Sequence, residues 1–135
     1  MHQEAERTDM EGALGVARRR GFLGRLPAEM ADQIISEGVL VRHPSGSTSR
    51  PGEGGEVAVL VSGVVRYYMS AADGRQITIR YAGVGDLVGT VTRTGSGLST
   101  NLQAIGPASL LHVDGGRLME IAERRPELEI GRAHV

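Results

Sequence analysis

The stretch VAVLVSGVVRYYMSAADGRQITIRY, residues 57–81, decides the fold. It opens with an unbroken apolar run at 57–61, which has the length of a strand and is typical of a sandwich interior. Gly63 then interrupts the pattern, and a bulge or a bend is the natural interpretation of a glycine at that point. Asp73-Gly74 is a strong signal for a tight hairpin turn. The stretch therefore predicts a strand, a bend, a second strand and a third strand that returns from the turn.

The strand after the hairpin alternates between apolar and polar side chains. Such a period of two places alternate residues on opposite faces of a sheet. The expected arrangement has Ile77, Ile79 and Tyr81 on one face and Gln76, Thr78 and Arg80 on the other.

Further β patterns lie on both sides of this stretch, separated by corners rich in Gly, Pro and Ser. They predict strands at 39–41, 100–104 and 109–113, with a loop at 44–55. Short strands at this spacing favour a sandwich or jelly roll.

Helices are expected at both ends of the β region. One short amphipathic helix is predicted at 10–17, after an irregular polar tail at 1–9. A second begins after Pro27, and a third begins after Asp114, a good N-cap. The fold class is therefore mainly β, a double-stranded β-helix or jelly roll with flanking α-helices.

Composition narrows the class of function. The chain has 135 residues, enough for one domain, and a formal net charge of -1, so we expect no DNA contact by this chain. The absence of cysteine excludes disulfides, Cys-ligated zinc and Cys-ligated iron–sulfur clusters. No stretch approaches the roughly 18 apolar residues that cross a bilayer, and the N-terminus is not a secretory signal. The expected location is the cytoplasm.

No pattern of catalytic or metal-binding residues stands out. The histidines form no H-x-H or H-x-x-E cluster, and His43 and His112 are interpreted as strand-end residues rather than ligands. A Ser/His/Asp spacing, a P-loop and a dinucleotide fingerprint are also missing from the sequence. We expect neither an enzyme nor a metal site.

Six segments resemble, in order and spacing, the cyclic-nucleotide-binding sensor domain of the CRP/FNR family of transcription regulators. The resemblance covers roughly residues 20–128 and implies a small-molecule effector and a homodimer in the full-length protein. The matching segments are FLGRLP at 22–27, PGE at 51–53, VLVSGVVR at 59–66, DGRQITI at 73–79, GVGDLVG at 83–89 and RPEL at 125–128.

The resemblance also implies a ligand cassette within GDLVGTVTRTGSGLSTNLQAI, residues 85–105. Gly89 keeps the family's glycine, but Thr90 stands at the position of the ribose-binding Glu. Leu98 stands at the position of the phosphate-binding Arg, and Ser99 follows it as the hydroxyl residue. Each lost charge-assisted contact costs about 1.5–3 kcal/mol, so two losses weaken binding at least about a hundredfold. The expected effector is not a tightly held cyclic nucleotide.

Other residues near the cassette are candidate replacements. Arg93 or Arg80 could supply the missing cation, the alternative for each being exposure to solvent. Thr90, Ser99 and Thr100 could bind a small polar ligand, the alternative being hydrogen bonds within turns and caps. The residues specify no cofactor.

The length of chain after the β-roll limits which DNA-binding element we expect. We divide the chain into a tail and short helix at 1–20, the β-roll at 21–124 and the truncated start of a dimerisation helix at 125–135. Too few residues follow Pro126 for a helix-turn-helix. Residues 130–135 also match the translation of a sequencing adapter, so we expect the gene model to be truncated. The alternatives to a regulator's sensor domain are a regulatory module of a kinase, channel or carrier, a ligand-free interaction domain and, last, a small β-roll enzyme.

Overall fold

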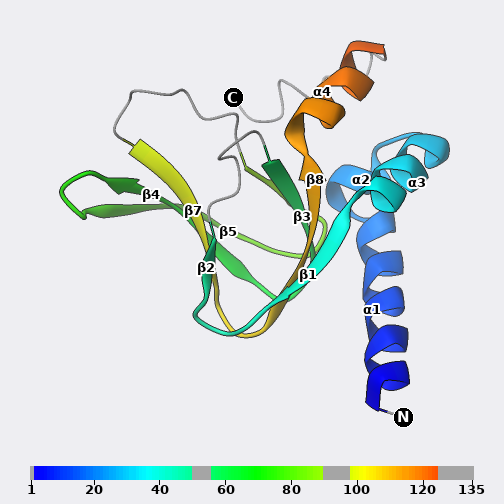
Figure 1. Ribbon diagram of the computed structural model, residues 1–135, viewed down its shortest axis with the longest axis horizontal. Coiled ribbons are helices and arrows are strands. Elements are labelled where there is room, and N and C mark those ends of the chain that lie inside the picture. The colour runs from blue at the N-terminus through cyan, green and yellow to red at the C-terminus, as the bar shows by residue number, and fades with distance from the viewer. Residues whose placement is uncertain (1, 50–55, 90–97, 125–135) are drawn as a thin grey trace.

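The computed structural model describes residues 2–49, 56–89 and 98–124, and within them it shows two antiparallel four-stranded sheets and four helices (Figure 1). The first sheet has the order β1-β8-β3-β6 and is called here the helix-side sheet. Its strands are β1 (Val39–His43), β3 (Glu56–Ser62), β6 (Leu87–Val88) and β8 (Ala108–Asp114). The second has the order β2-β7-β4-β5 and is called the outer sheet. Its strands are β2 (Thr48–Ser49), β4 (Val65–Ala71), β5 (Gln76–Ala82) and β7 (Leu98–Ala104).

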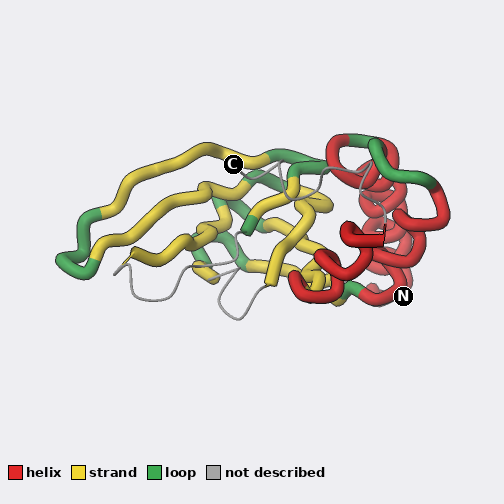
Figure 2. Tube along the Cα trace, turned by 90° about the horizontal axis from the view of Figure 1, so that it is seen from above, coloured by secondary structure: helices red, strands yellow, loops and turns green. Residues whose placement is uncertain are grey.

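The domain has three layers, with the helix-side sheet in the middle. Figure 2 shows the helices gathered at one end of the strands. Alternate residues of β3 belong to two different cores. Val57, Val59 and Val61 pack against the helices, while Ala58 and Leu60 pack against the outer sheet. The apolar run predicted as an interior strand is therefore a strand that is buried on both faces. The predicted fold class, mainly β with flanking helices, is confirmed.

The strand–bend–strand–hairpin prediction is also confirmed. β3 ends at Ser62 and β4 begins at Val65, on either side of Gly63. At the hairpin tip, the Ala71 N–H donates to the Arg75 carbonyl at 2.9 Å, and the Gly74 N–H donates to the Ala71 carbonyl at 3.0 Å. The Asp73 carboxylate accepts from the Arg75 N–H at 3.1 Å. The β4–β5 hairpin extends away from the helices (Figure 1).

The predicted alternation along β5 is wrong because of a bulge. Tyr67 pairs with Arg80, but the next residue, Tyr68, pairs with Thr78, so Ile79 is an extra residue. The bulge moves Arg80 to the inner face of the outer sheet, the face toward the helix-side sheet, together with Tyr67. Tyr81 consequently shares the opposite face with Arg66, while Ile77 lies on the inner face opposite Met69.

The loop predicted at 44–55 contains a short strand. β2 pairs with β7, Thr48 opposite Gln103 and Ser49 opposite Leu102. Residues 50–55 of this prediction lie outside the described residues.

The helices are α1 (His2–Arg19), α2 (Gly21–Gly24), α3 (Ala28–Glu37) and α4 (Gly115–Arg124). The irregular tail predicted at 1–9 is wrong, because α1 begins at His2 and continues through Gly12 and Gly15. No proline interrupts that segment, and its fully buried Ala17 joins the core between helices and sheet. Among the described helices, none is long and apolar enough to cross a membrane.

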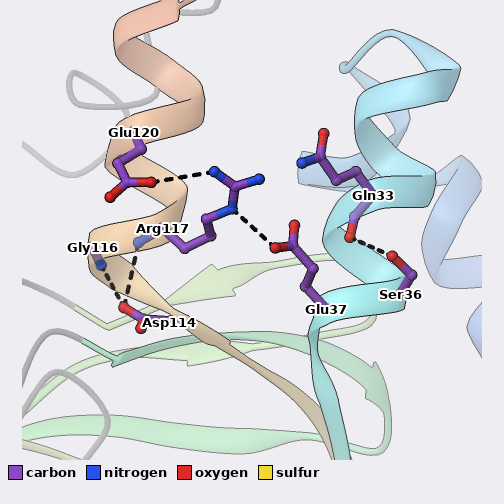
Figure 3. A network of polar contacts seen from close by, with 7 residues as sticks. All are labelled: Gln33, Ser36, Glu37, Asp114, Gly116, Arg117 and Glu120. Atoms are coloured by element: carbon purple, nitrogen blue, oxygen red, sulfur yellow. Dashed lines mark hydrogen bonds and ion pairs between the residues drawn. The ribbon is translucent and has the colours of Figure 1, made fainter.

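The last helix is fixed to α3. The Asp114 carboxylate accepts from the N–H groups of Gly116 at 2.8 Å and Arg117 at 3.3 Å, which confirms the predicted N-cap. The Arg117 guanidinium then pairs with Glu37 of α3 at 2.9 Å and with Glu120 at 3.2 Å (Figure 3). The helix that follows the β-roll is thus tied to the helical layer.

We expect Gly63→Ala to destabilise the domain more than Gly74→Ala. Both glycines have left-handed φ angles, 86° and 88°, which cost a residue with a Cβ about 1–2 kcal/mol. A Cβ on Gly63 would also lie 2.5 Å from the Pro107 carbonyl oxygen, whereas one on Gly74 meets nothing within 4 Å. Denaturant unfolding should show at least about 1 kcal/mol of additional loss for Gly63→Ala. Equal losses for the two variants would contradict this explanation.

Candidate functional site

The approach to the cassette is a turn bonded to the central strand. The Gly83 N–H donates to the Asp86 carboxylate at 2.8 Å, and the Asp86 N–H donates to the Gly83 carbonyl at 3.0 Å. Leu60 of β3 bonds to both sides of this turn, donating to Asp86 at 2.9 Å and accepting from Gly85 at 2.8 Å. The turn leads into β6 and the buried Gly89. The first end of the cassette is therefore rigidly placed.

The far end of the cassette is β7. Leu98 is its first residue, paired at Cα level with Ala71 of β4. Ser99 faces outward, and its hydroxyl and carbonyl lie 3.4 and 3.3 Å from the Asn101 side-chain amide. Thr100 pairs with Met69 and faces the helix-side sheet. The structure thus places the two hydroxyls on opposite faces, while Thr90 and Arg93 lie outside the described residues.

Arg80 bridges the two sheets beside this turn. Its Nη2 donates to the Leu87 carbonyl of β6 at 2.7 Å, and its Nη1 lies 3.8 Å from the Asp86 carboxylate. Its side chain is 45% exposed. Arg80 is therefore not a purely solvated residue on an open strand face. Its guanidinium carries five N–H donors, and these two contacts do not use all of them.

Two hydroxyls on the inner face of the outer sheet lack partners. The Tyr67 hydroxyl and the Thr100 Oγ1 are buried, and neither has a hydrogen bond in the described part of the chain. Leaving a buried polar group unpaired costs about 1–3 kcal/mol, so each such group needs an explanation. No pattern in the sequence singles out Tyr67, because a tyrosine in an apolar strand is ordinarily a core residue.

The structure also joins two histidines that the sequence places 69 positions apart. The Nε2 atoms of His43 on β1 and His112 on β8 lie 3.1 Å apart, with ring centroids at 5.4 Å. Both rings project toward the outer sheet, since the β1–β8 register puts them on the face of Leu110. Burial first, and then the proximity of His112, lowers the pKa of His43 below its usual 6.5. Within the described ranges, no group of three or more metal-ligating side chains is present.

The comparison with known families decides the classification. The family model described as the cyclic nucleotide-binding domain matches residues 49–125, more than half of the chain. The chain belongs to this family. The match includes both ends of the cassette, β6 and β7. No curated protein sequence matches the chain significantly.

Solved structures share the fold of this cyclic nucleotide-binding domain. A candidate cAMP-binding regulatory protein of Silicibacter pomeroyi DSS-3 aligns with a TM-score of 0.69 at 20% identity, over 92% of this chain and 62% of that one. The N-terminal domain of a transcriptional regulator from Streptomyces coelicolor A3(2) aligns with a TM-score of 0.58 at 22% identity, covering 84% and 83%. Oxidized CprK in complex with o-chlorophenolacetic acid gives 0.57 at 22% identity, covering 76% and 43%.

These comparisons confirm the resemblance to CRP/FNR-type sensor domains. The chain spans less than two thirds of the Silicibacter protein. At these identities the alignments establish the fold of the domain, while its ligand has to be argued from its own residues.

We expect the domain to lose stability as pH falls below about 6.5, in part through His43. Its folded pKa is lowered, so the unfolded chain binds more protons between the folded value and 6.5. The contribution is complete above 6.5 and is lost as pH falls toward the folded pKa. Thermal unfolding from pH 8 to pH 5 should show a smaller fall in Tm for His43→Gln than for the wild type.

A profile of His43→Gln that coincides with the wild-type profile would show that His43 does not contribute.

Proposed function

We propose that this domain is the effector-sensing part of a CRP/FNR-type transcription regulator and that its effector is not a tightly held cyclic nucleotide. The observation that carries the proposal is the cassette inside the family match, in which the resemblance puts Thr90 and Leu98 at the two positions that specify the nucleotide. Neither side chain can supply the charge-assisted contacts that a buried ribose and phosphate require.

The ligands of the structural neighbours support a wider range of effectors. One neighbour is described as a candidate cAMP-binding protein, whereas CprK was solved with o-chlorophenolacetic acid. The same fold therefore accommodates ligands of different chemistry, and the family match alone does not specify a cyclic nucleotide.

Signalling in this proposal passes from the cassette to α4. An effector that binds one arrangement of the cassette more tightly shifts the population toward that arrangement. β6 at one end of the cassette bonds to β3, and β3 bonds to β8, which leads directly into α4. DNA reading and dimerisation belong, in this proposal, to parts outside the described residues, and the domain itself catalyses no reaction.

Calorimetry with cyclic AMP tests the nucleotide part of the proposal. We expect no low-micromolar affinity for the wild type. The double variant Thr90→Glu/Leu98→Arg should bind cyclic AMP at least about a hundredfold more tightly, because it restores two charge-assisted contacts. Thr90→Glu/Leu98→Gln, which adds a polar group without a cation, should recover much less. Low-micromolar binding by the wild type would refute the proposal.

A thermal-shift screen of nucleotides, organic acids and neutral metabolites tests whether the domain senses anything. A ligand at a hundred times its Kd stabilises the native state by about 2.7 kcal/mol, which raises Tm by several degrees. We expect at least one class to produce such a shift. A domain that no class stabilises at millimolar concentration would instead be a ligand-free interaction domain.

A further inference from the structure

The inner face of the outer sheet carries two buried hydroxyl groups without partners in the described chain, those of Tyr67 and Thr100. Tyr67 is only 6% exposed and belongs to the core between the sheets. An aromatic ring of the same size without the hydroxyl would fill this place without an unsatisfied polar atom. A hydroxyl buried at such a cost indicates a partner that the described residues do not provide.

The register of the strands brings the two groups near each other. Tyr67 pairs with Leu102 and Met69 pairs with Thr100, so Tyr67 and Thr100 are diagonal neighbours on one face. Diagonal neighbours in an antiparallel pair lie about 7–8 Å apart at Cα level. The two hydroxyls are therefore close enough for one small molecule to contact both. Both are buried in this structure, so that molecule has to displace the groups that cover them.

A cation lies beside them on the same face. Arg80 pairs directly with Tyr67 across the β4–β5 ladder, and the bulge at Ile79 turns it inward. Of its five N–H donors, one is committed to the Leu87 carbonyl at 2.7 Å, and the Asp86 carboxylate is 3.8 Å from Nη1. The remaining donors form a planar fork that matches a carboxylate.

The same face continues as apolar surface toward the hairpin tip. Met69 and Ile77 are cross-strand partners there, Met69 half-buried and Ile77 68% exposed. The face thus offers hydroxyl donors and a cation next to an exposed apolar surface. This combination matches a molecule with a negatively charged oxygen group at one end and an apolar body at the other.

We propose that this face of β4, β5 and β7 binds a small organic acid. Its carboxylate accepts hydrogen bonds from Tyr67 and Thr100, Arg80 balances its charge, and its apolar body lies against Met69 and Ile77. The inference rests on the proposed sensing function and names the chemical class of the effector.

The probes are phenylacetate and octanoate, each compared with its neutral amide by thermal shift and calorimetry. We expect both carboxylates to raise Tm at millimolar concentration and to bind at least about tenfold more tightly than the amides, because only the carboxylate carries a charge for Arg80. No stabilisation by either carboxylate at 10 mM would overturn the proposal.

Tyr67→Phe separates a ligand-binding hydroxyl from a structural one. We expect it to weaken carboxylate binding about tenfold while the ligand-free Tm stays at or above that of the wild type, since only an unpaired atom is lost. A fall of several degrees in the ligand-free Tm would show that the hydroxyl has a structural partner and would overturn the proposal.

Tyr68→Phe is the matched control, because Tyr68 is equally buried on the same strand but faces the opposite side, where its ring contacts the Arg66 guanidinium at 4.1 Å. It should leave carboxylate binding unchanged. Arg80→Gln should abolish the preference for carboxylate over amide, a ratio that does not depend on overall stability.

The result also separates this inference from the proposed function. An effector found by the screen that is neutral, and whose affinity is unaffected by Tyr67→Phe and Arg80→Gln, would overturn the organic-acid site and leave the sensing function intact. A domain that binds neither the carboxylates nor any member of the screen would refute both.

Discussion

The burial of β3 on both faces is the constraint on which the rest of the domain depends. One set of its side chains is packed by helices and the other by the outer sheet, so neither layer can be removed without exposing this strand. Burying a Val or Leu side chain contributes about 1.5–3 kcal/mol, which makes the run at 57–61 a main source of stability. β3 also pairs with β6 and bonds to the Gly83–Asp86 turn, so the same strand holds one end of the cassette in place.

The outer sheet converts this stable frame into a candidate sensor. Its inner face is apolar where the helix-side sheet covers it and becomes polar near Arg80 and Thr100, next to the two ends of the cassette. The helix-side sheet thus holds the site in place, and the inner face of the outer sheet carries the candidate ligand-binding groups. Sites built on strands hold their groups more precisely than sites built on loops.

The sequence predicted features that depend on local patterns, namely the apolar run, the bend at Gly63, the Asp73-Gly74 turn and the Asp114 cap. The sequence did not predict the features that depend on how the strands pair. The bulge at Ile79 is invisible to a count of alternating residues, because it depends on how β5 aligns with β4. The β1–β8 register likewise places His43 and His112 on one face, opposite Ala108 and Val39, and only the structure shows that their rings meet. Tyr67 was missed because only the full set of neighbours reveals that its hydroxyl is unpaired.

The bulge has a consequence for behaviour at high concentration. β5 is an edge among the described strands of the outer sheet, and it exposes Ile77, Ile79 and Tyr81. A long flat edge with such side chains is a template on which a second chain can add as a further strand and begin an aggregate. The extra residue at Ile79 breaks the regular spacing of backbone donors and acceptors along this edge. The distortion that turns Arg80 inward therefore also makes this edge a poorer template for pairing with other copies of the chain.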